Sequence, residues 1–185
     1  MKLKAFFFTI IFVSISSIVS TPLVQAQTCV DGKLEPPSKQ TRTYRNQQLG
    51  FSFQLPANYR AMALTRGGVE VLDPASYEWT QCIIRNREAT EGKLAPVSIY
   101  LNPITFSERS LEAIIRTKYP WVSAAFKPTT VSNQPALTAS YNEILSGSPI
   151  TDFYFLTPDQ KHLVRISGPE QGEVLSLALS TFTLK

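Results

Sequence analysis

The chain has 185 residues, of which 43% are hydrophobic, and a formal net charge of +4. Without Lys2 and Lys4, which fall in the N-terminal segment described next, the charge is +4 − 2 = +2. So small a charge, with no dense Lys/Arg run, gives no reason to expect nucleic acid as a partner, and the length suits one domain with a proper core.

Residues 1–26 have the features of a secretory signal peptide. Lys2 and Lys4 form a basic head, residues 5–19 are apolar apart from Thr and Ser, and Ala26 closes a stretch of small residues. The apolar stretch is shorter than the roughly 20 residues of a membrane-spanning helix. We therefore expect an exported protein, located in the periplasm, a thylakoid lumen or the extracellular space. Its mature chain is expected to be soluble and not to span a membrane.

Residues 27–43 are expected to form a polar N-terminal arm, because Gly32, Pro36 and Pro37 interrupt it and it has no apolar periodicity. The arm contains Cys29, and the other cysteine of the chain is Cys82. Two cysteines in an exported chain favour a disulfide between them. Two free thiols and a lipid attached to Cys29 remain as alternatives.

The rest of the chain, residues 44–185, is predicted to be one domain made mostly of strands. Apolar residues alternate with polar ones, or short apolar runs follow turn signals, in the segments 51–55, 69–71, 82–85, 97–101, 137–141, 152–156, 162–167 and 182–184. Segments 152–156 and 162–167 flank Pro158-Asp159, a turn signal that predicts a hairpin.

Two helices are predicted between these strands. Ser107 is the expected N-cap of a helix over residues 108–119, whose apolar stripe contains Leu111, Ile114 and Ile115. The second is expected to begin at Pro169 and Glu170, since proline suits the first position of a helix. Strands interrupted by separate helices indicate an α+β fold, in which an antiparallel β-sheet is covered by helices.

Residues 49–59, LGFSFQLPANY, resemble the opening of the PsbP-like family, which contains the photosystem II extrinsic protein PsbP and related small exported bacterial proteins. The matching positions are Gly50, Phe51, Phe53, Pro56 and Tyr59. The later segments YLNP, VSNQPALTASYNE and DFYFLTPDQKHLVRISG are also similar, so the resemblance covers about residues 44–185. It implies a PsbP-like α/β/α sandwich. The arm over residues 27–43 and a metal-binding pair have no match, so the resemblance does not carry the oxygen-evolution role.

Side chains suited to catalysis are sparse. His162 is the only histidine, and with Cys82 it could form a thiol–imidazole pair. However, His162 directly follows the predicted turn and Cys82 is expected to be oxidised. A zinc site needs three or four ligands of this kind, and no Gly-x-Ser-x-Gly or Gly-rich phosphate loop occurs. We therefore predict no catalytic residue, no metal and no cofactor, with a hydrolytic enzyme as the least favoured alternative.

Aromatic and basic side chains are candidates for contact with a partner. Tyr and Trp are enriched at interfaces, although core packing and a charged edge strand at Arg85 and Arg87 are the plainer explanations. The candidate contacts are Tyr77, Trp79, Arg85, Arg87 and Trp121. We expect a non-enzymatic accessory or assembly factor that acts by protein contact at a photosynthetic or other membrane complex. The alternative is a small-molecule or lipid binding module with a pocket between sheet and helix.

Overall fold

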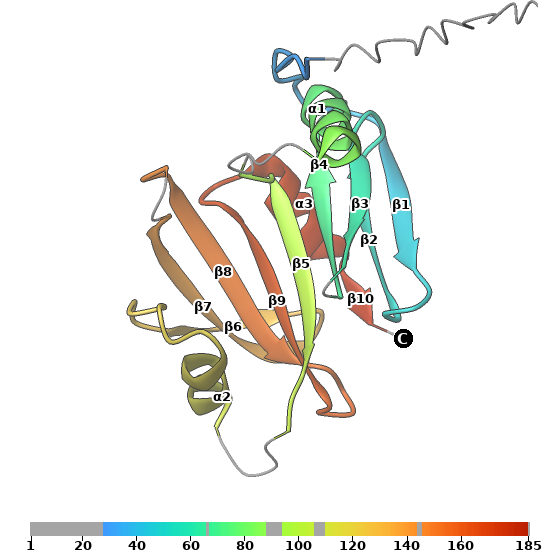
Figure 1. Cartoon of the computed structure of the whole chain (residues 1–185). Coiled ribbons are helices and arrows are strands. Elements are labelled where there is room, and N and C mark those ends of the chain that lie inside the picture. Colours follow the sequence, from blue (N-terminus) through green and yellow to red (C-terminus); the bar gives the residue numbers. More distant parts are fainter. Residues whose placement is uncertain (1–27, 66, 88–93, 106–109, 144–145, 185) are drawn as a thin grey trace, which may run out of the picture.

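A computed structural model describes residues 28–65, 67–87, 94–105, 110–143 and 146–184. The predicted signal peptide, residues 1–26, and residue 27 lie outside this range. The described residues form ten strands and three helices, and the strands make two antiparallel sheets (Figure 1). This arrangement confirms the predicted α+β class.

The smaller sheet has the strand order β1-β2-β10. Its members are β1 (Thr41–Asn46), β2 (Phe51–Pro56) and β10 (Thr183–Leu184). Phe51, Phe53 and Leu55 of β2 are buried, as their alternation predicts. β1 begins at Thr41, within the segment 27–43 that the sequence analysis assigned to the arm. The first three residues of β1 are exposed, and its pairing with β2 rather than an apolar pattern makes it a strand.

The larger sheet has the strand order β3-β4-β5-β9-β8-β7-β6. Its strands are β3 (Arg60–Leu64), β4 (Gly68–Leu72), β5 (Val97–Pro103), β6 (Lys127–Val131), β7 (Gln134–Asn142), β8 (Pro149–Leu156) and β9 (His162–Pro169). β8 and β9 form the predicted hairpin, with Leu156 opposite Leu163 beside the turn. The sequence had indicated one sheet, and the structure corrects this to two.

Helix α1 (Pro74–Asn86) replaces the strand predicted over residues 82–85, which was wrong. Asp73 caps its N-terminus, because the Asp73 carboxylate accepts from the backbone N–H groups of Ala75 and Ser76. Pro74 then occupies the first turn, where its missing N–H costs nothing. Arg87 ends the helix in the left-handed conformation with φ of 55°. Arg85 and Arg87, expected on a charged edge strand, therefore lie at the end of a helix.

The other two helices begin later than predicted. Helix α2 (Leu111–Lys118) is capped by Ser110, whose hydroxyl accepts from the Ala113 N–H; the predicted cap Ser107 lies outside the described residues. Helix α3 (Glu173–Thr181) begins after Gly172. Pro169 is the last residue of β9, so the predicted start at Pro169 and Glu170 was wrong.

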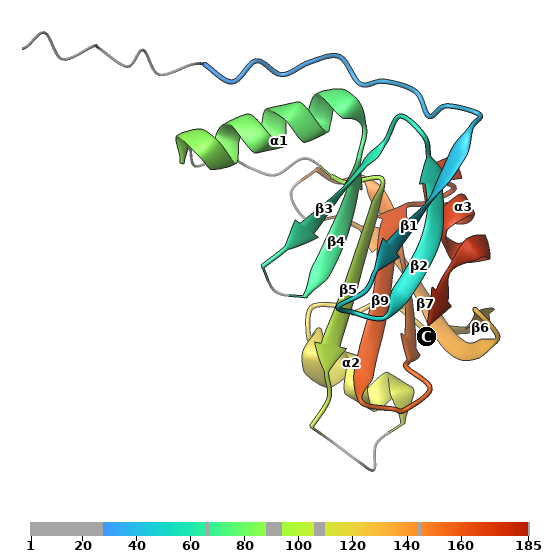
Figure 2. The same cartoon turned by 90° about the vertical axis from the view of Figure 1, so that its right-hand side faces the viewer.

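Each face of the larger sheet has its own hydrophobic cluster. On one face, α3 and the smaller sheet pack on β5, β9 and β8 through residues such as Phe53, Val164 and Phe182. On the other face, α2 packs on β8 through Ile115, and Tyr154 is buried with it. No residue of α1 belongs to either cluster, and Figures 1 and 2 show α1 at the end of the sheet opposite α2.

Candidate functional site

Helix α1 has fewer fully buried residues than either of the other two helices. Ser76 is its single buried residue, whereas Ile84 is 59% exposed. Figure 2 shows the helix extending beyond the strands, with the N-terminal arm running beside it. Only its underside meets the sheet, where the Gln81 side-chain amide lies 3.5 Å from the Met62 sulfur. Glu78, Ile84 and Arg85 are exposed, and the other α1 residues apart from Ser76 are half-buried, so the exposed surface for contact lies at these three positions.

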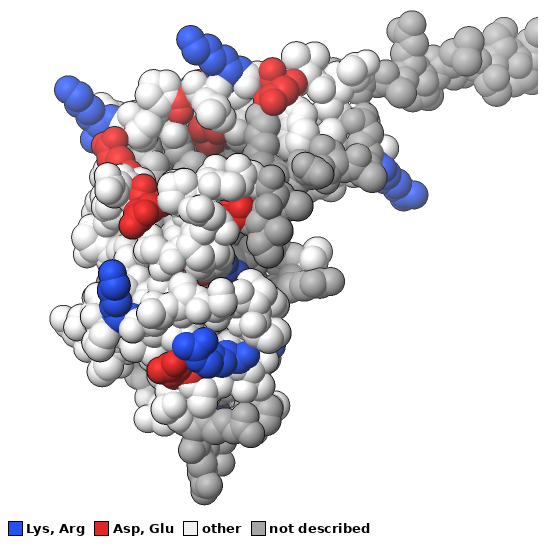
Figure 3. All heavy atoms as spheres, turned by 90° about the vertical axis from the view of Figure 1, so that its left-hand side faces the viewer, with Lys and Arg blue, Asp and Glu red and all other residues white. Residues whose placement is uncertain are grey.

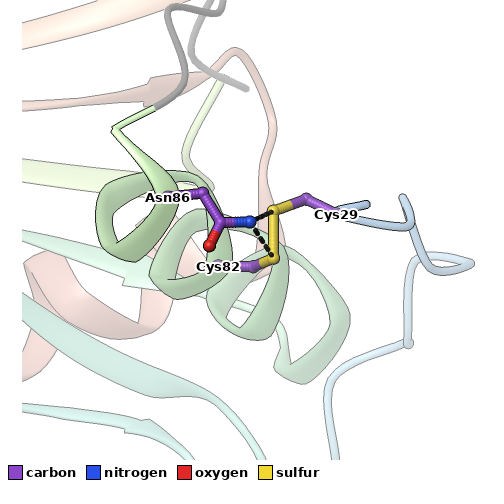
Figure 4. Close-up of a disulfide and its surroundings, with 3 residues drawn as sticks. All are labelled: Cys29, Cys82 and Asn86. Carbon is purple, nitrogen blue, oxygen red and sulfur yellow. Dashed lines mark hydrogen bonds between the residues drawn. A yellow bond between two sulfur atoms is a disulfide. The ribbon is translucent and has the colours of Figure 1, made fainter. Parts of the chain in front are cut away.

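The predicted disulfide joins Cys29 of the arm to Cys82 of α1, with an Sγ–Sγ distance of 2.04 Å. Asn86, one turn further along α1, directs its Nδ2 at both sulfurs, at 3.3 Å from Cys29 Sγ and 3.7 Å from Cys82 Sγ (Figure 4). The arm also approaches α1 at Gly32, where an added Cβ would lie 2.9 Å from the Ala75 Cβ. The disulfide and this contact hold the arm along two turns of α1.

Asp73 links the arm, α1 and the sheet. Its Oδ1 accepts from the Glu35 N–H at 3.4 Å as well as from the helix N-terminus, and the Tyr59 hydroxyl donates to the Glu35 carbonyl at 3.0 Å. Burial raises the pKa of Asp73, but the hydrogen bonds from Ser76, Glu35 and Ala75 together outweigh burial and lower it. The arm is thus fixed to the body at Glu35 as well as at Cys29.

The structure does not bring the five candidate contact residues together. Tyr77 and Trp79 are both half-buried on α1, but two residues of helix turn their side chains about 160° apart. Arg85 and Arg87 are exposed at the C-terminal end of the same helix. Trp121 is 54% exposed and follows α2, which lies at the opposite end of the sheet (Figure 1). Its ring meets Tyr119 edge-on at 5.3 Å.

Sequence reasoning missed the charged cluster on the α2 face of the larger sheet. Asp152 of β8 is 0% exposed at its side chain and Arg165 of β9 is 16% exposed. Arg165 donates through Nε to Asp152 Oδ2 at 3.0 Å and through Nη2 to Oδ1 at 3.1 Å. The hydroxyls of Tyr141 and Tyr154 donate to Asp152 Oδ2 at 2.8 Å and 2.5 Å. The carboxylate is therefore fully hydrogen-bonded by one cation and two phenols.

Aromatic rings enclose the Arg165 guanidinium further. Its carbon lies 5.2 Å from the Tyr119 ring centroid and 5.7 Å from that of Tyr100, both within cation–π range. Burial lowers the pKa of Arg165, but the Asp152 charge, the hydrogen bond to Asp152 and the charges of Tyr154 and Tyr141 together outweigh burial, and the net shift is upward. Burial, reinforced by the Asp152 charge, raises the pKa of Tyr154 and Tyr141 well above the usual value. These groups keep their ordinary protonation states near neutral pH, which suits a structural network.

These shifts predict a loss of stability in alkali. The unfolded tyrosines ionise near pH 10, whereas the native Tyr141 and Tyr154 hold their protons to higher pH. The free energy of unfolding should therefore be undiminished below about pH 10 and fall above it, by up to about 1.4 kcal/mol per pH unit for each tyrosine. Urea midpoints at about pH 9 and about pH 11 measure this. Tyr141→Phe should make the fall shallower, and an unchanged slope in that variant would contradict the assignment.

His162 and Cys82 lie far apart. His162 begins β9 beside the β8–β9 turn, which lies at the end of the sheet opposite α1 (Figure 1). It lines an open depression of about 350 Å³ together with Asp159, Leu101, Gln47 and Leu184. Within the described ranges no three His, Cys, Asp or Glu residues are grouped so as to hold a metal ion.

Two surface properties bear on partners. On the face that Figure 3 shows, the blue Lys and Arg side chains are scattered singly over the surface and form no basic patch. Among the helices that the structure describes, none is long and apolar enough to cross a membrane.

Comparisons with known proteins show similarity of fold alone. No family model and no curated protein matches the chain. A solution structure of cyanobacterial PsbP (CyanoP) from Synechocystis sp. PCC 6803 aligns with a TM-score of 0.49 and 11% identity, over 83% of this chain and 96% of that chain. The Ran-binding protein Mog1p of Saccharomyces cerevisiae aligns with a TM-score of 0.45 and 8% identity, over 78% and 95%.

A protein from Bacteroides thetaiotaomicron VPI-5482 aligns with a TM-score of 0.45 and 12% identity, over 79% of this chain and 49% of that chain. The present chain thus spans about half the length of that protein. Similarity this distant assigns no family and carries no argument about function. Membership of the PsbP-like family, expected from residues 49–59, stays a prediction.

Proposed function

We propose that this protein is an exported, non-enzymatic accessory or assembly factor that acts by contact with other proteins. The observation that carries the proposal is helix α1, which has 13 residues, one of them buried, and presents Ile84 to solvent. A helix of this length is marginal by itself in water. Here a cap, a proline and a disulfide hold a helix that contributes little to the core, which is typical of a surface kept for binding.

The setting follows from the chemistry of the cysteines. Disulfides persist in oxidising compartments, so the Cys29–Cys82 bond supports export to the periplasm, a thylakoid lumen or the extracellular space. The partner we propose is a protein of a photosynthetic or other membrane complex. The contact surface includes Ile84, Tyr77 and Arg85 of α1, with Trp121 as a separate point.

Photo-crosslinking in the native compartment tests this proposal. A photoreactive amino acid at Ile84 should give one adduct of defined mass, whereas the same group at Thr130, exposed on β6, should give none. Arg85→Gln should weaken the Ile84 adduct with little change in thermal stability, because Arg85 is exposed. Equal adducts at Ile84 and Thr130, or none at Ile84, would count against protein contact through α1.

The alternative function, binding of a small molecule or lipid, has one feature in its favour. The turn between β6 and β7 and the end of α3 flank an open depression of about 630 Å³. Phe153 and Leu179 contribute apolar surface to it, and Ser176 and Asn133 contribute polar groups. Native mass spectrometry of protein purified from its own compartment would reveal a retained ligand as a defined mass increment.

A further inference from the structure

Strand β3 forms one rim of the larger sheet. It is hydrogen-bonded to β4 on one side, and of the other described elements only α1 makes appreciable contact with it. Figure 2 shows it at the outer border of the sheet. Arg60 and Ala63 are exposed, and Ala61, Met62 and Leu64 are half-buried. Within the part of the chain that the structure describes, no strand pairs with its outer backbone edge.

The other edge strands have features that discourage pairing, whereas the interior of β3 does not. β6 carries Lys127 and Pro128, β1 carries Arg42 and Arg45, and β10 has only two residues. Charges, proline and shortness are the usual means of protecting a sheet edge. The segment from Ala61 to Leu64, by contrast, contains neither charge nor proline. This contrast singles out β3 as the edge suited to pairing with another chain.

Glu70 indicates the chemistry that the added strand would need. It lies opposite Met62 in the adjacent strand β4, and so on the same face of the sheet. Its half-buried carboxylate makes no hydrogen bond or ion pair within the described part of the chain, and burial raises its pKa. A nearby cation stabilises the charged form of a half-buried carboxylate that has no other partner.

We propose that the outer edge of β3 pairs with an extended segment of a partner protein, and that a Lys or Arg of this segment, level with Met62, reaches Glu70. Successive strands lie about 4.8 Å apart, so the added residue and Glu70 would be about 10 Å apart along the sheet. Two long side chains on one face span this separation across Met62. This inference rests on the proposed function, because it names the kind of partner segment involved.

A second copy of this chain fits the edge less well. Self-pairing of β3 would offer Glu70 only the guanidinium of Arg60, whose Nη1 already lies within 3.5 Å of the carbonyl oxygens of Ala57, Asn58 and Tyr59. A segment of another protein can present a Lys or Arg that has no competing contacts of this kind. The observations therefore favour a partner with a free basic side chain.

The test uses the purified protein and a short peptide of alternating threonine and valine with one central lysine. Hydrogen exchange followed by NMR should show new protection of the β3 amides. The lysine peptide should bind about fivefold more tightly than the same peptide with glutamine, as expected for one partly exposed ion pair. Glu70→Gln should remove that preference.

Two matched variants locate the contact. Ala63→Lys places on β3 the kind of charge that guards the other edges and should abolish binding, whereas Thr130→Lys on β6 should leave it unchanged. Protection at another edge, a lysine preference that survives Glu70→Gln, or no binding would overturn the proposal. Concentration-dependent dimerisation with β3 protected in the absence of peptide would overturn it in favour of self-pairing.

The crosslinking and peptide experiments fail separately. If the Ile84 adduct forms but the peptide does not pair, only the assignment to β3 is wrong. If the peptide pairs but the adduct does not form, the proposed contact through α1 is wrong.

Discussion

Replacing Arg165 by methionine is expected to lower the free energy of unfolding by about 3–5 kcal/mol. The substitution leaves Asp152, which is 0% exposed, without the two N–H donors that neutralise its charge. The hydroxyls of Tyr141 and Tyr154 remain, but they carry no positive charge. Urea unfolding near neutral pH measures the effect as a lower midpoint, with an unchanged dependence on urea if both states stay equally compact.

Two comparisons separate the buried charge from loss of packing. The double replacement Arg165→Met with Asp152→Leu removes both charges and should recover most of the lost stability. Glu112→Gln breaks the exposed pair with Arg116, in which the side chains are 50% and 46% exposed, and should cost about 0.5 kcal/mol or less. If Arg165→Met cost no more than Glu112→Gln, the charged cluster would not stabilise the sheet.

The parts of the fold that the sequence predicted correctly depend on neighbouring residues. In β2 and β5, apolar side chains alternate over the whole strand, and the period of two places them on one face. The β8–β9 hairpin was predictable because Pro158 and Asp159 are turn residues between two apolar strands. In each case the local pattern and the final environment agree.

The segment of α1 shows how a local pattern can mislead. Cys82, Ile83 and Ile84 form a short apolar run with two β-branched residues, which favours a strand. The competing signal was Asp73-Pro74, an N-cap followed by a proline in the first turn. Ile84 proves to be 59% exposed, so the apolar run was not a sign of burial. The N-cap at Asp73 therefore predicts the structure of this segment correctly, whereas the apolar pattern of residues 82–84 does not.

The remaining errors concern contacts between residues far apart in the sequence. β1 is largely exposed and becomes a strand only by pairing with β2, and the division into two sheets follows from that pairing. The cluster of Asp152 and Arg165 had a signal that could have been used. Asp152 is the first residue of one predicted strand of the hairpin and Arg165 lies within the other, between Val164 and Ile166. The hairpin register brings Arg165 opposite Tyr154, beside Asp152. Its burial, however, depends on α2, which joins from outside the hairpin.

Removal of the disulfide by Cys29→Ser with Cys82→Ser is expected to lower the free energy of unfolding by about 2–4 kcal/mol. The two cysteines are 53 residues apart, and loop-closure entropy for that length gives about 4 kcal/mol. The observed loss should be smaller, because the arm before Glu35 also gains freedom in the native state once Cys29 is released.

The local consequence separates this account from a general weakening of the fold. The hydrogen bonds of Glu35 to Asp73 and Tyr59 do not involve the disulfide, so the Glu35 amide should retain its protection from hydrogen exchange, while the backbone NMR order parameters of residues 28–34 should fall. Ser76 anchors the first turn of α1 in the core, whereas Cys82 is the point at which the third turn is tied; exchange should therefore increase towards Asn86. Asp73→Ala is the complementary variant. It should increase exchange at Glu35 and in the first turn of α1, while the disulfide at Cys82 remains. Uniform loss of protection along α1 in both variants would contradict separate anchoring at its two ends.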